Sequence, residues 1–363
     1  MHIEELATPA VLVDLDVATR NLDRMAGFCQ KHGLGLRPHT KTHKSLEFAR
    51  RQLSRGSRGL TVAKVGEAEV IVAATPGEIL VAHPVFGAAQ LERLARLAAE
   101  TEILIAIDSD AAAEAISCAA ARLGVSFGIL VEFDSGFRRC GLAAGAACVA
   151  LARGIERLPG LRLRGLMTYF GNIWGSEEER ASQIRCTARE VQRAVEAFEA
   201  ERLPLEIVSG GSTPAAVLSH LIPGLTEIRP GTYIFNDMNT VYQGACSLDD
   251  CAVRVLTTVV STAISGQAII DAGSKTLSSD PLSSGPKSGY GFIVGQPSVT
   301  LTRLNEEHGY VDITRAGPLR IGEKLSVIPN HVCACVNMHD EVFIVGGEQV
   351  IDTWKVDARG KVR

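Results

Sequence analysis

The stretch EILIAIDSDAAAEAISCAAARLGVSFGILVEFD, residues 102–134, predicts the fold of the first part of the chain. It begins and ends with apolar runs, 102–108 and 127–134, which are typical of buried strands. Between them, residues 110–123 repeat their apolar positions at three- and four-residue spacing, as an amphipathic helix does. Two strands joined by a helix of this kind form a parallel strand–helix–strand unit.

The same unit recurs through the first 240 residues. The other strand-like runs are 10–15, 34–41, 59–64, 78–83, 161–169, 206–212 and 225–231. The other helical segments are 17–31, 44–55, 87–100, 142–155 and 176–201. Nine strands are one more than a closed (β/α)8 TIM-type barrel needs, so we expect AVLVDL (10–15) to lie outside it. The alternative is an open doubly wound sheet, but the glycine-rich turn that it needs after the first strand is missing.

Beyond residue 245 the pattern changes to short β-branched runs separated by Gly, Pro and Ser. These runs are 251–263, 267–273, 308–314, 324–338 and 341–346. They predict a C-terminal all-β domain. We expect the barrel to span 12–245 and the β-domain to combine 1–11 with 246–363. A loop rich in Ser, Gly and Pro at 274–291 is long enough to suggest a functional role.

The composition narrows the class of protein. Hydrophobic residues make up 46% of the 363 positions and charged residues 21%, which excludes a disordered chain. With a net charge of −4 and no basic tract, we expect no nucleic-acid partner. No apolar run reaches the roughly 18–20 residues of a membrane span, so no membrane partner is expected. An acidic N-terminus unlike a signal peptide and an odd count of nine cysteines favour reduced thiols in the cytoplasm.

The string RPHTKTHK (37–44) ends one predicted strand. Strand alternation would place His39, Lys41 and His43 on one face. A lysine at the carboxyl end of a barrel strand lies at the catalytic mouth, where burial and nearby cations favour the neutral amine that Schiff-base chemistry requires. The alternative is a basic loop that faces solvent.

Three further strand ends carry polar groups. The segment SGGSTP (209–214) offers glycine amides, hydroxyls and a helix start, which together can hold a phosphate. The segment RPGTY (229–233) adds donors at the next strand, and barrels often bind phosphate at their last two strands. The segment DSGFRRCG (134–141) places an arginine beside glycine turns, although an ordinary surface loop would have the same pattern.

His331 and Cys333 form a candidate metal pair. A spacing of two would put both side chains on one face of a strand, and Cys335 would face the same way as a further thiol. Imidazole nitrogen and thiolate sulfur suit zinc, and two protein ligands leave positions open for water and substrate. The alternative is a pair of buried side chains without a ligand.

Together these motifs resemble a known family of fold-type III pyridoxal 5′-phosphate (PLP) enzymes, the alanine racemase-like class. Within it the chain resembles the D-serine dehydratase and D-threonine aldolase branch, through TPAVLVDLD, RPHTKTHK, DSGFRRCG, SGGSTP, EIRPGTY, DAGSKT, EEHG and PNHVC. The resemblance covers nearly the whole chain. It implies a barrel that binds PLP, a β-domain that receives the first strand, and a homodimer.

The resemblance also assigns residues by position. Lys41 matches the lysine that binds PLP as an imine. Arg139 matches an arginine near the phenolic oxygen of PLP, and Tyr169 a tyrosine near its ring. The matches to phosphate ligands are Gly211, Ser212, Thr213, Gly231, Thr232 and Tyr233. His331 and Cys333 match the ligands of a divalent metal, His308 is a further candidate, and the role of Arg229 stays open.

The resemblance implies a lyase that acts on small 3-hydroxy-D-amino acids. Cys333 favours zinc and dehydration to a 2-oxo acid and ammonia, with D-serine or D-threo-3-hydroxyaspartate as substrate, whereas aldolase-like members often carry His-x-Asp, which suits manganese or magnesium. Asn172 stands where many aldolase-like relatives have a histidine, and an amide cannot act as a base. Retro-aldol cleavage to glycine and an aldehyde is the alternative. A racemase with Tyr290 as second base, or a non-catalytic PLP carrier, are further alternatives.

Overall fold

The computed structural model describes residues 1–74, 77–283 and 289–363. The chain divides into two compact units, which we describe separately. The barrel unit consists of Met25–Lys41, Leu46–Gly231 and Lys361–Arg363. The sheet unit consists of Met1–Arg24, Thr42–Ser45 and Thr232–Gly360. The domain limits inferred from the sequence, at residues 11/12 and 245/246, stay a prediction.

The barrel unit contains eight parallel strands in the spatial order β2-β9-β8-β7-β6-β5-β4-β3. The strands are β2 (Gly35–Leu36), β3 (Gly59–Val62), β4 (Glu78–Val81), β5 (Ile103–Ile107), β6 (Phe127–Glu132), β7 (Leu161–Met167), β8 (Ile207–Gly210) and β9 (Glu227–Ile228). An isolated parallel bridge between His39 and Thr61 links β2 to β3 and nearly closes the ring. The predicted eight-stranded barrel is confirmed.

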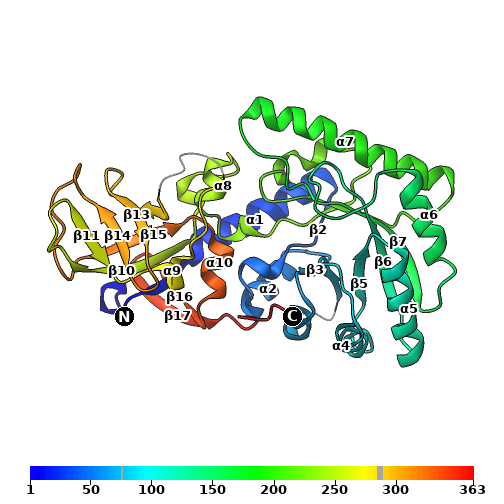
Figure 1. The fold of residues 1–363 in the computed structure, drawn as a ribbon, viewed down its shortest axis with the longest axis horizontal. Helices are drawn as coiled ribbons and strands as arrows, with labels where there is room; N and C mark the ends of the chain where they lie inside the picture. Colours follow the sequence, from blue (N-terminus) through cyan, green and yellow to red (C-terminus); the bar gives the residue numbers. More distant parts are fainter. Residues whose placement is uncertain (75–76, 284–288) are drawn as a thin grey trace. The chain divides into compact units, whose positions relative to one another are not determined.

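Helices alternate with the barrel strands in sequence, beginning with α1 before β2, and Figure 1 shows α4 to α7 outside the strands that they connect. The helices are α1 (Leu15–His32), α2 (Leu46–Leu53), α3 (Val65–Ile71), α4 (Ala88–Ala98), α5 (Asp110–Leu123), α6 (Ala146–Ile155) and α7 (Glu177–Ala200). A 3-10 helix, η4 (Ala216–Leu221), takes the place of a helix between β8 and β9. The strands pack their apolar side chains together, among them Leu80, Leu104, Leu130 and Met167. Among the residues that the structure describes, no helix combines the length and hydrophobicity needed to cross a membrane.

The sheet unit is built on nine strands, seven of them in the order β13-β14-β11-β10-β1-β16-β17, with β15 pairing to both β10 and β12. The strands are β1 (Ala10–Asp14), β10 (Val253–Ser261), β11 (Gln267–Ile270), β12 (Gly291–Ile293), β13 (Thr300–Leu304), β14 (Gly309–Asp312), β15 (Lys324–Pro329), β16 (Glu341–Gly346) and β17 (Gln349–Lys355). Strand β1 lies antiparallel to β10 and parallel to β16. The prediction that the first strand lies outside the barrel is therefore confirmed.

Short helices accompany this sheet and correct one prediction. They are α8 (Met238–Tyr242), α9 (Ser274–Leu277) and α10 (Val332–Asn337). The run 324–338 was expected to be one strand, but β15 ends at Pro329 and α10 follows. The buried side chains of α10 are Val332, Cys335 and Val336, which is the spacing of a helix face.

The string RPHTKTHK also departs from the prediction. Strand β2 ends at Leu36, and Thr40–Thr42 form one turn of 3-10 helix, η2. The strand alternation that would place His39, Lys41 and His43 on one face is therefore wrong. Pro38 is a physical reason, because a proline has no N–H to donate to a neighbouring strand. Its carbonyl still accepts the N–H of Thr61 at 2.9 Å.

Candidate active site

The carboxyl ends of the barrel strands carry most of the predicted cofactor residues. Lys41 follows β2, Arg139 follows β6 and Tyr169 follows β7, while Gly211 to Thr213 follow β8 and Gly231 follows β9. Hydrogen bonds connect these ends. The N–H of His39 donates to the carbonyl of Pro230 at 3.0 Å, the N–H of Arg229 to Gly210 at 2.9 Å, and Oγ of Ser212 to the carbonyl of Phe170 at 2.9 Å. The predicted residues of the barrel unit therefore lie along one part of its rim.

Lys41 is half-buried in the 3-10 turn η2. Its main-chain N–H lies 3.3 Å from Nδ1 of His39, which orients the turn. Within the described ranges, Nζ of Lys41 takes part in no hydrogen bond or ion pair. A lysine amine that is not engaged by the protein suits imine formation with an aldehyde.

The turn after β8 has the chemistry of a phosphate cup. Gly211 has a φ of +105°, and a Cβ there would lie 3.2 Å from the main-chain nitrogen of Arg229, so the turn requires glycine. Gly211, Ser212 and Gly231 are buried, yet their main-chain N–H groups donate to no protein acceptor in the part of the chain that is described. Buried N–H groups need acceptors, and phosphate oxygens would supply them. These residues therefore fit the phosphate of PLP.

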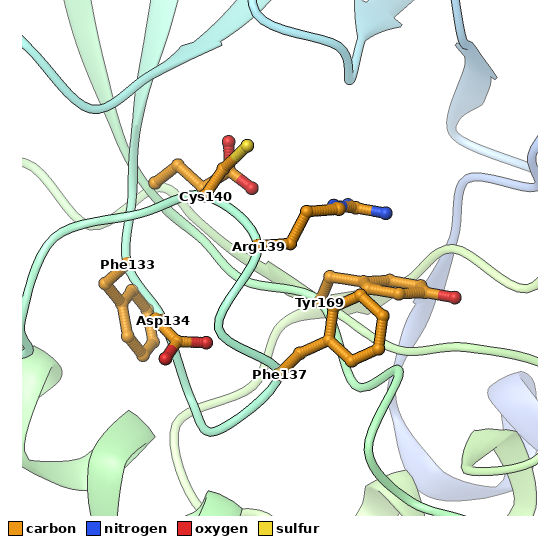
Figure 2. A pocket seen from close by; sticks show the side chains of 7 residues that line it. Phe133, Asp134, Phe137, Arg139, Cys140 and Tyr169 are labelled. Atoms are coloured by element: carbon orange, nitrogen blue, oxygen red, sulfur yellow. The ribbon is translucent and has the colours of Figure 1, made fainter.

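A small pocket at the end of β6 and β7 brings charged and aromatic side chains together (Figure 2). The guanidinium carbon of Arg139 lies 4.5 Å from the centre of the Tyr169 ring. The rings of Phe137 and Tyr169 meet edge to face, with their centroids 5.1 Å apart. The pocket lining consists of Glu132, Phe133, Asp134, Phe137, Arg139, Cys140 and Tyr169. The structure thus brings together Arg139 and Tyr169, which the sequence placed near PLP only by resemblance.

Glu132 also lines this pocket, although the sequence did not single it out. It is the last residue of β6 and is only 2% exposed. Its Oε2 has no hydrogen-bond partner among the described residues. Burial raises the pKa of its carboxyl to about 7, against the opposing effect of Arg229 and Arg139. The available signal was a carboxylate inside the apolar run FGILVEFD.

Arg229 lies in the core of the barrel unit. Its Nη1 donates to Oγ of Ser209 at 2.6 Å, and its Nη2 donates to the carbonyl of Thr168 at 2.7 Å. Burial lowers the pKa of its guanidinium to about 10. Both terminal nitrogens of Arg229 therefore donate to groups of the barrel itself. The role of Arg229 toward the cofactor, which the sequence left open, stays open.

Two other residues singled out by the sequence are Asn172, in the loop after β7, and His308. Oδ1 of Asn172 is buried without a hydrogen-bond partner among the described residues. A Cβ on Gly136 would lie 3.1 Å from Nδ2 of Asn172, so the loops after β6 and β7 are in close contact. His308 is exposed in the turn between β13 and β14.

The sheet unit brings the predicted metal pair together at the start of α10. His331 is the residue before the helix and Cys333 lies in its first turn. Nδ1 of His331 lies 2.6 Å from Oδ2 of Asp280. Sγ of Cys333 lies 3.2 Å from Oγ1 of Thr42 and 3.7 Å from Oγ1 of Thr232. Neither Asp280 nor Thr42 was predicted from the sequence.

The charges around His331 suit a cation. A hydrogen bond with Cys333 raises the pKa of the His331 imidazole to about 10, and Asp280 and Asp237 act in the same direction against burial. Negative groups that stabilise a proton on the imidazole would also stabilise a metal ion in its place. Among the described residues, no cluster of three or more His, Cys, Asp or Glu side chains forms a metal site. Imidazole nitrogen and thiolate sulfur are donors that zinc accepts, and a catalytic zinc keeps a position open for water or substrate, so the donors fit a zinc-like ion.

Cys335 does not join this pair, which corrects the expectation that it faces the same way. Its side chain is buried, and its Sγ donates to the carbonyl of Thr276 at 3.2 Å. Burial raises the pKa of its thiol to about 12. The strand alternation behind that expectation does not apply, because residues two apart on a helix point in different directions.

Two of the predicted phosphate ligands belong to the sheet unit. Thr232 and Tyr233 lie in the 3-10 helix η5 (Thr232–Ile234), directly after Gly231. Tyr233 is buried, whereas the hydroxyl of Thr232 is near the thiol of Cys333. The side chain of Thr232 is therefore placed beside the predicted metal pair.

Comparisons with known proteins agree with the geometry of the two units. Residues 13–238 match the family "Alanine racemase, N-terminal domain", and residues 252–345 match "Putative serine dehydratase domain". The chain is 33% identical to D-threonine aldolase from Arthrobacter sp, over 97% of this chain and 93% of the relative. It is also 33% identical to D-threo-3-hydroxyaspartate dehydratase from Delftia sp. (strain HT23), over 96% of this chain and 97% of the relative.

Solved structures extend the similarity to three dimensions. The crystal structure of D-threonine aldolase from Filomicrobium marinum matches with a TM-score of 0.91 at 31% identity, over 99% of this chain and 98% of that one. A D-threo-3-hydroxyaspartate dehydratase with a cysteine-to-alanine substitution, in the metal-free form, matches with a TM-score of 0.88 at 32% identity, over 98% of both chains. The chain belongs to the alanine racemase-like family of PLP-dependent lyases that includes D-threonine aldolase and D-threo-3-hydroxyaspartate dehydratase.

Proposed function

We propose that the protein is a PLP- and zinc-dependent dehydratase of 3-hydroxy-D-amino acids, of the D-serine or D-threo-3-hydroxyaspartate type. The products would be a 2-oxo acid and ammonia. The proposal includes a cytoplasmic homodimer. The observation that carries it is the placement of His331 directly before α10 and of Cys333 in its first turn, with both side chains half-buried.

The barrel unit supplies the residues for the cofactor. PLP, when bound, withdraws electrons from the α-carbon of an amino acid. Lys41 would hold the cofactor through Nζ and, once released, take the α-proton at the same atom. The N–H groups of Gly211, Ser212 and Gly231 would bind the phosphate. Arg139 and Tyr169 would contact the ring side, where their own stacking already fixes their orientation.

The sheet unit supplies the residues for the metal. A divalent ion, when bound, acts as a Lewis acid that makes a hydroxyl a better leaving group. His331 and Cys333 would hold this ion through nitrogen and sulfur, a donor set that favours zinc over the harder manganese or magnesium. A D-threo-3-hydroxyaspartate dehydratase with a cysteine-to-alanine substitution is known in a metal-free form, which implies that a relative also has a metal-bound form.

Asn172 favours elimination over retro-aldol cleavage. A retro-aldol reaction needs a base for the proton of the substrate hydroxyl, and an amide cannot serve as one. Asn172 occupies the loop after Tyr169, and its buried Oδ1 has no hydrogen-bond partner among the described residues. Loss of a hydroxyl group needs no such base when a Lewis acid assists the departure.

Retro-aldol cleavage to glycine and an aldehyde remains the second candidate. It is favoured by the identity of 33% with a D-threonine aldolase and by the TM-score of 0.91 with a structure of that enzyme. A metal-bound hydroxide could replace the missing base. Both reactions use a D-amino acid with a hydroxyl on the β-carbon.

Product analysis separates the two candidates. The purified protein, loaded with PLP and zinc, is incubated with D-serine, D-threonine and D-threo-3-hydroxyaspartate, each with and without a chelator. We expect ammonia and a 2-oxo acid in equal amounts, lost on chelation. Glycine with an aldehyde would identify an aldolase instead, and inversion of the substrate alone would contradict both.

A further inference from the structure

The contact between Asp280 and His331 is the part of the metal-pair region that the proposed function does not use. Oδ2 of Asp280 lies 2.6 Å from Nδ1 of His331. A carboxylate at this distance accepts the Nδ1–H of the ring, which fixes both the tautomer and the ring plane. The lone pair of Nε2 is then directed away from Asp280 and is available to a metal ion.

The backbone around Asp280 is held in place from two sides. Its N–H donates to Oγ of Ser278 at 3.2 Å, and its carbonyl accepts from Nδ2 of Asn330 at 3.2 Å. Nδ2 of Asn330 also donates to the carbonyl of Gly289 at 3.0 Å. Ser278 has a φ of +67°, a conformation that a residue with a side chain keeps only when its surroundings hold it there. Because Asn330 is the neighbour of His331, the carboxylate and the imidazole are anchored to the same short segment.

A second aspartate fixes the main chain of the pair. Oδ2 of Asp237 accepts the N–H of Val332, the residue between His331 and Cys333, at 3.0 Å. The other oxygen, Oδ1, accepts the N–H of Thr240 at 2.9 Å. Asp237 is only 1% exposed, so this anchor is part of the core of the sheet unit. The position of Val332 is thus set independently of Asp280, and Asp280 is left to set the orientation of the ring.

We propose that Asp280 is a positioning residue that orients His331 for metal binding through the Oδ2···Nδ1 hydrogen bond. The inference rests on the metal role in the proposed function and adds the residue that prepares the ligand. Carboxylates that bind the second nitrogen of a ligating histidine raise its basicity and fix its direction, and their loss weakens metal binding about 10–100-fold. Asp280 acts through His331 and contacts no reacting group itself.

Zinc affinity is the direct test. Zinc binding to the full-length, PLP-loaded protein is measured by competition with a chromophoric chelator, for the wild type, Asp280→Ala and Asp280→Asn. We expect Asp280→Ala to weaken zinc binding about 10–100-fold. Asp280→Asn should lose less zinc affinity, because its amide oxygen can still accept the Nδ1–H of His331. If Asp280→Ala does not fold, Asp280→Asn provides the test. Unchanged affinity in both variants would overturn the inference.

Two controls separate a positioning role from a general loss of structure. Asp312→Ala removes an aspartate whose Oδ1 accepts from Thr314 in the same unit, and it should keep wild-type zinc affinity. With cobalt(II) in place of zinc, the sulfur-to-metal absorption band should persist in Asp280→Ala and disappear in Cys333→Ala. Activity of Asp280→Ala should return as zinc is raised, which a misfolded variant would not show. If the wild type binds neither zinc nor cobalt, the metal role in the proposed function is wrong. If the wild type and both Asp280 variants bind zinc equally well, only the role of Asp280 is wrong.

Discussion

Oγ1 of Thr42 lies 3.2 Å from Sγ of Cys333, although 291 positions separate the two residues in the chain. Thr42 is joined by a peptide bond to Lys41, the residue that we expect to bind PLP. One short segment therefore carries both the amine for the cofactor and a hydroxyl that contacts the predicted metal ligand. Lys41 and the metal pair can each be tested by substitution with its own readout, visible absorbance for the lysine and metal content for the pair.

The first prediction concerns Lys41. Lys41→Ala should remove the visible absorbance of the PLP imine and lower turnover by at least about 100-fold, since the variant lacks both the imine and the base. Reconstitution with PLP followed by an absorbance spectrum and a product assay checks this. Lys31→Ala, which changes an exposed lysine near the end of α1, is the control and should stay yellow and active. A yellow, active Lys41→Ala would contradict the assignment.

The second prediction concerns Cys333. Cys333→Ala should lose bound zinc and activity while it keeps the visible absorbance, because Lys41, which would form the imine, lies in the barrel unit and does not depend on the thiol. Cys333→Asp should regain activity with manganese or magnesium, since a carboxylate oxygen suits harder cations than a thiolate does. Metal content and metal-dependent rates check both variants. Wild-type zinc content in Cys333→Ala would mean that the thiol is not a ligand.

The patterns that repeat along the chain were predictable, and the contacts between distant residues were not. Residues 110–123 were expected as a helix and form α5 over the same positions, because their spacing allows no other buried face. Residues 332–336 are small and apolar, so they fit a strand or a helix, and the helix start is stabilised by Asp237, which accepts the N–H of Val332 from far away in the sequence. The contact of Asp280 with His331 joins residues 51 positions apart, a relationship that no local pattern shows.

The third prediction concerns the pH dependence of stability at Glu132. Burial raises the pKa of its carboxyl from 4.5 to about 7, so the folded protein binds more protons than the unfolded chain between these values. Stability should therefore fall as the pH rises through this window, by about 3 kcal/mol at pH 8 from this group. Glu132→Gln cannot lose a proton, so it should be more stable than the wild type at pH 8 and similar at pH 5. Urea unfolding of the cofactor-free protein at both pH values checks this. The same difference in unfolding free energy between Glu132→Gln and the wild type at pH 5 and pH 8 would contradict it.

The fourth prediction concerns the buried ion pair between Arg37 and Glu227. Nε of Arg37 donates to Oε1 of Glu227 at 2.9 Å, and their side chains are 1% and 0% exposed. Arg37→Met should lower the free energy of unfolding by about 3–5 kcal/mol, because it leaves a buried carboxylate without its cation. The double variant Arg37→Met with Glu227→Gln should cost less than the sum of the single changes, since it removes both charges together.

Urea unfolding of the three variants gives the coupling between these two charges. Arg153→Met is a suitable control, because Arg153 pairs with Glu156 and Glu201 on the exposed surface, and such pairs contribute little to stability. The variant should therefore unfold close to the wild type. Additive effects of Arg37→Met and Glu227→Gln would show that the two side chains stabilise the barrel unit through separate contacts, Glu227 through the hydroxyl of Ser209 at 2.6 Å and Arg37 through Glu78 at 2.7 Å.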